Sequence, residues 1–209
     1  MMDLTAREWV THSITHPFEG FEDMRWKTAG SIKIASVIVI LWFIASIFYN
    51  RLYGFQFYTQ PDKMFNVIPY IVQTIILFLT WVVGNWSICT LLDGEGTVRN
   101  IYIYSAYALI PYVASIYIDV FLSHFLIRDE MVFIQAVRII GLRWTVVLVF
   151  SAIKSVHQYS VLKTILAIVL TIAAMLIMLF LLVLLLSLFQ QVYVFIYSIY
   201  TELAYRLKV

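Results

Sequence analysis

Residues 84–99 read GNWSICTLLDGEGTVR, a polar stretch with several glycines that separates two long apolar runs. The dipeptides Asp93-Gly94 and Glu95-Gly96 are typical of tight turns, because glycine adopts backbone conformations that other residues disfavour. On both sides of this stretch the chain is apolar for long enough to form a membrane helix. The stretch therefore predicts a tight hairpin between two membrane helices.

The composition of the chain is that of a membrane protein. Of its 209 residues, 63% are hydrophobic and only 12% are charged, whereas an ordinary soluble domain has about 25% charged residues. Five apolar runs approach or exceed the roughly 20 residues that cross a bilayer as a helix. They lie at residues 32–49, 64–92, 101–127, 137–156 and 164–188. The sequence predicts an all-α polytopic membrane protein: a five-transmembrane-helix bundle (31–209) preceded by a short N-terminal amphipathic helix.

Several functional classes have no signature in this chain. The 14 Lys and Arg residues are scattered, which argues against nucleic-acid binding. Cys89 is the single cysteine and the four histidines are dispersed, so neither a disulfide framework nor a metal site is indicated. The phosphate-binding, dinucleotide-binding, zinc-protease and serine-hydrolase motifs are absent from the sequence. We expect no enzymatic activity, no metal and no cofactor.

Residues 1–30 are expected to form an arm at the membrane surface. Pro17 suits the first turn of a helix, and Phe18, Phe21 and Met24 then recur at helical spacing opposite acidic residues. This pattern predicts an amphipathic helix that lies on the membrane rather than across it. Its apolar face either packs under the first span or docks a partner.

Small and polar residues line one face of the second predicted span and one face of the third. Such faces pack together in lipid, where hydrophobic burial cannot drive helix association, so we expect these two spans to be neighbours. Pro111 lies inside the third span and is expected to kink it. The two faces consist of Gln73, Thr80, Gly84 and Ser87, and of Ser105, Ala108, Tyr112, Ser115 and Asp119.

Ionisable side chains inside the spans are the sharpest candidates for a site. Each costs roughly 3 kcal/mol on membrane-insertion scales and is a functional hypothesis by default. Asp119 lies in the second half of the third span, and in antiparallel neighbours the end of the third span and the start of the fourth lie on the same side, so either Arg143 or Arg138 is expected to pair with it. Such a pair either fixes helix register or forms a site for a solute, an ion or a partner.

The opposite end of the fourth span is expected to meet the turn of the hairpin. There Asp93 and Glu95 are expected near Lys154 and His157. Arg143, Lys154 and His157 fall on one stripe of the helix, which cannot face lipid. We therefore expect neighbouring helices to enclose that stripe.

The last apolar run is the clearest span. Its 25 residues, 164–188, contain no charge, Gly or Pro. At about 1.5 Å per residue it already exceeds a hydrocarbon core of roughly 30 Å. The helical continuation from Phe189 must therefore leave the membrane or lie along it.

The distribution of basic residues predicts a cytoplasmic N-terminus. The positive-inside rule weighs the charges that flank the first span most heavily. Those before or at its start are Arg7, Arg25, Lys27 and Lys33, and those after it are Arg51 and Lys63.

Taken in order and spacing, four stretches resemble the Yip-domain family, the Ypt/Rab GTPase-interacting integral membrane proteins, and in particular its bacterial branch. The resemblance covers nearly the whole chain. It rests on HPFEGF from His16 with Met24 following, NWSICTLLDGEG from Asn85, SAYALIPY from Ser105, and GLRW from Gly141 through to Val156-His157.

The resemblance implies five membrane helices, a cytoplasmic N-terminus, a short C-terminus, no enzymatic activity and, for the bacterial branch, the bacterial cell membrane as location. Eukaryotic members are linked to vesicle traffic and membrane shaping through small GTPases and Yip-family partners. This chain is expected to lack their long N-terminal cytoplasmic region, and a bacterial host makes a small GTPase an unlikely partner.

The lipid bilayer is one expected partner of this protein. Two functions remain open for it. One is a non-enzymatic scaffold or adaptor that binds another integral membrane protein or a second copy of itself. The other is a small-solute transporter, or an accessory subunit of one, with a polar path through the bundle. The scaffold would use Pro17, Phe18, Phe21, Met24, Asn85, Trp86, Asp93 and Glu95, and the path would be lined by Asp119, Arg143, Lys154 and His157. A polar cavity open to one side would favour transport, and closed packing with paired charges the scaffold.

Overall fold

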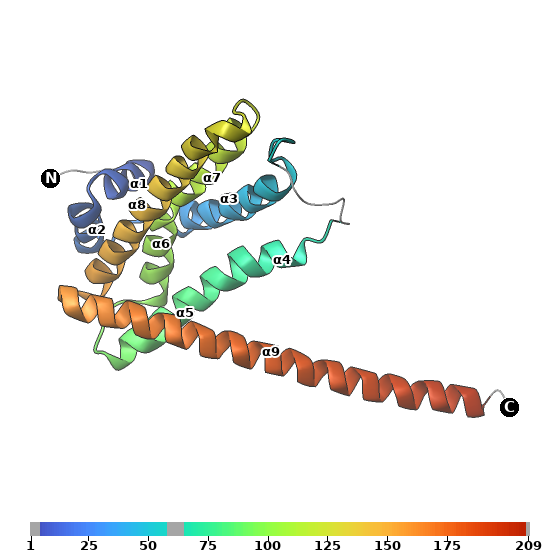
Figure 1. Cartoon of the computed structure of the whole chain (residues 1–209). Helices are drawn as coiled ribbons and strands as arrows, with labels where there is room; N and C mark the ends of the chain where they lie inside the picture. The colour runs from blue at the N-terminus through green and yellow to red at the C-terminus, as the bar shows by residue number, and fades with distance from the viewer. Residues whose placement is uncertain (1–4, 58–64, 208–209) are drawn as a thin grey trace.

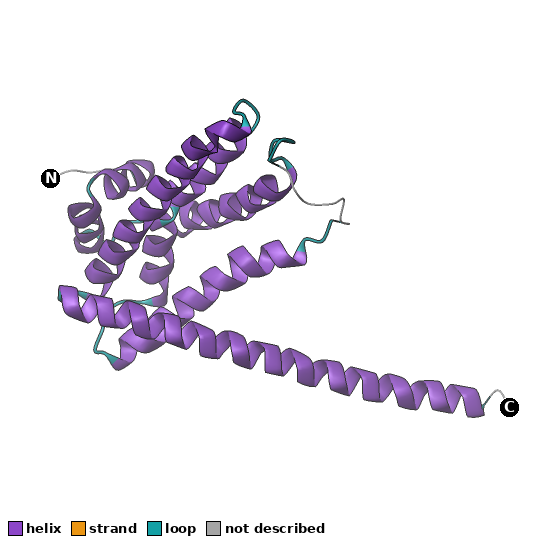
Figure 2. Ribbon diagram, in the orientation of Figure 1, coloured by secondary structure: helices purple, strands orange, loops and turns teal. Residues whose placement is uncertain are grey.

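The computed structural model describes residues 5–57 and 65–207, with the side chains of Ala6 and Arg7 left out. Lys63 and the expected start of the second span at Met64 lie outside that part of the chain. Every regular element within it is helical (Figures 1 and 2). Five helical stretches there are long and apolar enough to cross a membrane, which confirms the predicted all-α polytopic bundle.

The spans follow one another in the order predicted from the apolar runs. Two of them are interrupted: the second contains a π-helical turn and the third is broken near its middle. The elements are α3 (Ile32–Arg51), α4 (Ile68–Ile71) joined by the π-helical η1 (Val72–Ile76) to α5 (Leu77–Leu91), α6 (Val98–Ala108) with α7 (Ile110–Leu122), α8 (Met131–His157) after the short 3-10 turn η2 (Arg128–Glu130), and α9 (Val161–Arg206).

Two short helices precede the first span, α1 (Ala6–Thr15) and α2 (Pro17–Trp26). Only α2 was expected, although the Thr5-x-x-Glu8 capping box that starts α1 is readable in the sequence. Helix α1 packs on α2, and α2 packs along α8 (Figure 1). The apolar face of α2 is thus turned toward the bundle, but mainly against α8 and Tyr104 of α6 rather than under the first span as one of the two alternatives had it.

The break in the third span lies at Leu109, two residues before Pro111. Proline has no backbone N–H, and its ring crowds the carbonyl of residue i−4, here Tyr107. The predicted kink is therefore present. It divides the span into two halves, both packed between α3 and α8.

The expected pairing of the second and third spans holds only for α6, where the indole N–H of Trp81 donates to Ser105 Oγ at 3.0 Å. Helix α5 packs mainly on α9, and α7 on α8, where Ser115 lies against Gly141. Gln73 and Ser87 are exposed. The expectation was wrong because each span has polar residues on more than one face, and the face toward α9 is the one buried.

The core lies where the arm meets the inner ends of α3, α6 and α8. Tyr104 and Tyr107 of α6 are completely buried there, and the ring of Phe21 lies 5.8 Å from that of Tyr104. The hydroxyl of Tyr107 accepts a hydrogen bond from the Ser31 N–H at 3.1 Å. This contact holds the start of α3 against α6, so arm and bundle share one core.

Helix α9 is unlike the other spans. Its 46 residues extend about 69 Å, more than twice the hydrocarbon core of a bilayer. Only Thr164, Ala167 and Thr171 are buried, where α9 crosses α5. Every residue from Val183 to Leu203 is exposed, and Figure 1 shows this end projecting from the bundle as one straight helix.

Candidate functional site

Two polar clusters lie at opposite ends of α8. One surrounds His157 and the other joins Arg138 to Asp119. Along the axis of α8, Arg138 and His157 are about 28 Å apart at about 1.5 Å per residue. The two clusters therefore cannot belong to one small site.

His157 is the centre of a hydrogen-bonded chain that ties three helices and a turn together. The Gly96 N–H donates to Nδ1 of His157 at 3.2 Å, and Nε2 lies 3.1 Å from Asn85 Oδ1. Asn85 Nδ2 then donates to Thr171 Oγ1 at 3.2 Å, and the Thr171 hydroxyl donates to the Ala167 carbonyl at 2.7 Å. Because Nδ1 accepts a hydrogen bond from an N–H and Nε2 faces an amide oxygen, Nε2 is assigned the ring hydrogen and Nδ1 none, so the imidazole is neutral.

The turn of the hairpin packs closely against the same histidine. A Cβ atom on Gly94 would come within 2.5 Å of His157 Nδ1, and one on Gly96 within 2.5 Å of His157 Cε1. Tyr159 stacks on the imidazole with ring centroids 5.3 Å apart and donates its hydroxyl to the Cys89 carbonyl at 3.0 Å. Burial raises the pKa of Tyr159, which keeps that hydroxyl protonated as a donor. The expected proximity of the turn to His157 is confirmed.

The charges around this turn are paired differently from the expectation. Glu95 forms an ion pair with Arg25 of α2 rather than with Lys154. Arg25 also donates to the Ser155 carbonyl at 3.1 Å, so α2 clamps the turn to the end of α8. The ammonium of Lys154 lies 6.0 Å from the centre of the Phe18 ring, a cation–π distance.

Phe21 and Met24 are completely buried between α2 and the bundle, so they cannot contact a partner as the sequence interpretation proposed. Trp86 and Asp93 are exposed, and Asp93 has a left-handed φ of 56°. Pro17 occupies the first turn of α2. The arm and the hairpin thus bind each other and the bundle, which leaves only their outer residues for another molecule.

Arg143 is exposed, which corrects the expectation that neighbouring helices enclose its stripe. The next residue, Trp144, donates its indole N–H to the Ile14 carbonyl of α1 at 3.2 Å. Arg143 therefore lies at the level where the arm begins to cover α8. Only the far end of the stripe, at His157, is buried.

Asp119 pairs with Arg138, one of the two partners considered, and not with Arg143. Arg138 Nε donates to Asp119 Oδ2 at 2.9 Å, and Nη2 donates to the Tyr49 hydroxyl at 2.7 Å. The guanidinium also lies 4.7 Å from the centre of the Tyr49 ring. Asp119 is completely buried, and its Oδ1 has no hydrogen-bond partner among the described residues.

A small pocket of about 100 Å³ adjoins this ion pair, between α3, η1, α7 and α8. The sequence singled out none of its other polar members as site residues, because each is an ordinary polar residue of an apolar run, and Gln73 and Tyr112 were assigned to helix packing. What distinguishes these polar residues is that the fold brings them together around Arg138. The lining residues are Ser46, Tyr49, Asn50, Gln73, Tyr112, Ile116 and Arg138.

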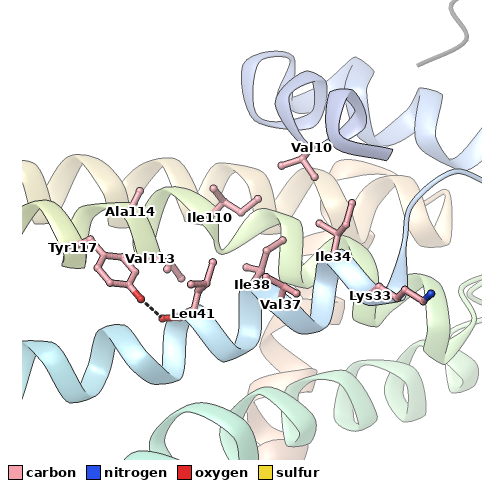
Figure 3. A pocket seen from close by; sticks show the side chains of 10 residues that line it. All are labelled: Val10, Lys33, Ile34, Val37, Ile38, Leu41, Ile110, Val113, Ala114 and Tyr117. Atoms are coloured by element: carbon pink, nitrogen blue, oxygen red, sulfur yellow. Dashed lines mark hydrogen bonds between the residues drawn. The ribbon is translucent and has the colours of Figure 1, made fainter. Parts of the chain in front are cut away.

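A larger groove of about 590 Å³ runs between α3 and α7, with Val10 of α1 above it (Figure 3). Its lining is almost entirely aliphatic; Lys33 lies at one end and Tyr117 at the other (Figure 3). The Tyr117 hydroxyl donates to the Leu41 carbonyl at 2.9 Å, which joins the two helices there. With no polar group along its middle, this groove suits hydrocarbon rather than a polar solute.

Comparison with known proteins gives one result. A family model for the Yip1 domain matches residues 11–185. No match was found among curated proteins or among solved structures. The matched range contains α2, both clusters of α8 and the packed part of α9, and it ends where α9 leaves the bundle. The chain belongs to the Yip1-domain family of integral membrane proteins.

Proposed function

We propose that this protein is a non-enzymatic membrane scaffold or adaptor, and that the free end of α9, residues 183–206, is its partner-binding surface. The observation that supports it is the length of α9. The helix continues about 35 Å beyond the part that packs on α5, and residues 183–203 are all exposed. A helix of this length without tertiary contacts needs a partner or lipid to cover its apolar side.

The sequence of the free end favours a partner helix. Apolar residues recur there with alternating spacings of three and four, the heptad pattern of helices that pack side by side. They are Leu185, Phe189, Val192, Ile196, Ile199 and Leu203. Polar residues lie away from this stripe: Ser187, Gln190, Gln191, Ser198 and Thr201. We assign the stripe to a helix of a second copy or of another integral membrane protein.

The alternative, transport of a small solute, receives less support. Its path needed Asp119, Arg143, Lys154 and His157 along one channel. Asp119 and His157 belong to clusters at opposite ends of α8, and Arg143 is exposed. The polar groups around His157 are hydrogen-bonded to one another rather than arranged along a cavity.

The scaffold proposal includes an orientation in the bacterial cell membrane. The ion pair of Arg25 with Glu95 places the arm and the 92–97 turn at the same end of the bundle. Together with the basic residues before α3, this supports a cytoplasmic location for both. The free end of α9, which crosses from that side, then emerges on the opposite face.

Site-specific photocrosslinking in native membranes tests the proposal. A benzophenone amino acid is introduced at Ile196, within the heptad stripe, and at Val194, on the opposite face two residues away. We expect a discrete protein adduct at position 196 and none at 194. An adduct of twice the 24.4 kDa chain mass identifies a second copy, and any other mass a different protein. Crosslinks to lipid alone, or equal protein adducts at both positions, would rule out the α9 surface.

A further inference from the structure

The pocket beside Arg138 is lined by residues with hydrogen-bonding groups, where a membrane bundle ordinarily has only apolar side chains. Of the seven residues that line it, all except Ile116 carry a hydrogen-bonding side chain. A polar cavity surrounded by hydrocarbon is unfavourable unless water or a ligand satisfies its groups. The volume of about 100 Å³ has room for about three water molecules at roughly 30 Å³ each, or for one group the size of phosphate.

The ion pair leaves hydrogen-bonding capacity on Arg138. A guanidinium has five N–H donors, and Arg138 meets Asp119 with Nε alone instead of through the two parallel bonds of a bidentate pair. A second donor, on Nη2, goes to the Tyr49 hydroxyl, which as the acceptor keeps its own hydrogen to donate. The pocket is bordered by the guanidinium and not by Asp119, so its side of the pair is rich in donors.

The rest of the lining adds uncharged donors from other helices. Gln73 and Asn50 carry amide groups, and Tyr112 a phenol. The Asn50 amide nitrogen already donates to the Ser46 carbonyl at 2.9 Å and has one further hydrogen to donate. Of the described residues that line the pocket, Arg138 alone is ionised at neutral pH. One guanidinium surrounded by amide and hydroxyl donors is the chemistry that binds a phosphate oxyanion.

The backbone conformation beside the pocket also supports a binding site there. Gln73 belongs to η1, five residues of π-helix within the second span. Such π-helical turns are rare and occur frequently at functional sites, because the wider turn shifts side chains around the helix. Thr74 of the same turn is buried in the bundle, whereas the Gln73 side chain is exposed and has no hydrogen-bond partner among the described residues, so its amide is available to a ligand.

The pocket also lies at a depth that phosphate can reach. Tyr49 and Asn50 are in the last turn of α3, and Arg138 is about 10 Å from the start of α8. In a hydrocarbon core about 30 Å thick, residues this close to the helix ends lie near the boundary between the core and the lipid headgroups. We propose that the pocket formed by α3, η1, α7 and α8 binds a phosphate group, supplied either by a phospholipid headgroup or by a phosphate compound in solution.

The test uses the full chain and the variant Gln73→Leu. This change removes one lining amide at an exposed position and leaves the Asp119–Arg138 pair intact, whereas a change at Arg138 would also destabilise the bundle. Gln190→Leu, on the free end of α9, is the matched control. Binding of inorganic phosphate is measured by calorimetry in a neutral detergent. Lipid retention is measured by native mass spectrometry from nanodiscs containing equal phosphatidylglycerol and a neutral glycolipid without phosphate.

Phosphate binding by the wild type that is about tenfold weaker in Gln73→Leu and unchanged in Gln190→Leu supports a soluble phosphate ligand. Preferential retention of phosphatidylglycerol, lost only in Gln73→Leu and without binding of inorganic phosphate, supports a lipid headgroup. The proposal is overturned if neither probe binds, or if Gln73→Leu binds as the wild type does.

Discussion

The two polar clusters of α8 differ in how completely they are closed. Around His157, the hydrogen-bonded series of Gly96, His157, Asn85 and Thr171 leaves each of these groups with a partner. The glycines of the turn lie so close to the imidazole that no space remains beside it. Around Arg138 one oxygen of Asp119 has no partner among the described residues, and a polar pocket adjoins the pair. Both contain ionisable residues in a membrane helix, yet only the open one has room for a ligand.

The difference shows why a buried charge in a membrane protein is not by itself a binding site. A satisfied network stabilises the fold and fixes which helices meet. A cluster with spare donors and a cavity keeps interactions available for another molecule. On this criterion the His157 cluster holds the α5, α8 and α9 helices in register, and the Arg138 cluster is the candidate for ligand binding.

Breaking the ion pair should have the largest effect on stability. Arg138→Leu leaves the buried carboxylate of Asp119 without its cation, and we expect a loss of about 3–5 kcal/mol in the free energy of unfolding. The double variant Asp119→Leu, Arg138→Leu removes both charges and should recover most of that loss. Reversible unfolding in mixed micelles measures both. A double variant as unstable as the single one would show that the pair is not the cause.

The closed cluster should be sensitive to added volume. Gly96→Ala brings a Cβ within 2.4 Å of Val156 Cγ1 and 2.5 Å of His157 Cε1, so we expect a loss of about 1–3 kcal/mol. Gly84→Ala is the control, because its nearest contact is the flexible terminal methyl of Met178 at 2.9 Å. Thermal unfolding of both variants in detergent makes the comparison. Equal losses of stability in Gly96→Ala and Gly84→Ala would mean that the turn is not tightly packed against His157.

A single hydrogen bond of the closed cluster should contribute less. Thr171→Val removes the acceptor of Asn85 Nδ2 with little change in shape, and such bonds between membrane helices average about 0.6 kcal/mol. Thr201→Val removes the same kind of hydroxyl, bonded to a carbonyl four residues earlier, from the exposed end of α9. We expect a measurable loss of stability only for Thr171→Val. An equal loss of stability in Thr201→Val would show that the effect of Thr171→Val does not come from its hydrogen bond with Asn85.

The smallest effect on stability is expected at the open cluster. Gln73→Leu should change the free energy of unfolding by less than about 0.5 kcal/mol, as exposed substitutions usually do, while it weakens phosphate binding. Asn85→Leu, a similar exchange of amide for hydrocarbon in the closed cluster, strands His157 Nε2 and should cost about 1–3 kcal/mol. Unfolding titrations of the two variants side by side check this. If Gln73→Leu were the more destabilising change, the pocket would be structural.

Much of the fold was predictable, because long apolar runs have one stable solution in a bilayer. The five spans, the kink at Pro111, the pairing of Asp119 with an arginine of the next span and the proximity of the turn to His157 all follow from local pattern and antiparallel order. Helix α1 was missed although its capping box at Thr5 is local. The faces joining the spans were misassigned, because small and polar residues occur on several sides of each helix.

By itself the sequence determined that this chain is an all-α membrane protein, where its five spans lie and which charged residues they carry, since these depend on hydrophobicity and periodicity. The tertiary structure alone decided that α5 packs on α9, that Phe21 and Met24 are buried, and that Arg138 rather than Arg143 meets Asp119. The pocket around Arg138 likewise exists only because four separate elements converge there. Convergence of distant residues depends on packing between helices, which no single helix's pattern specifies.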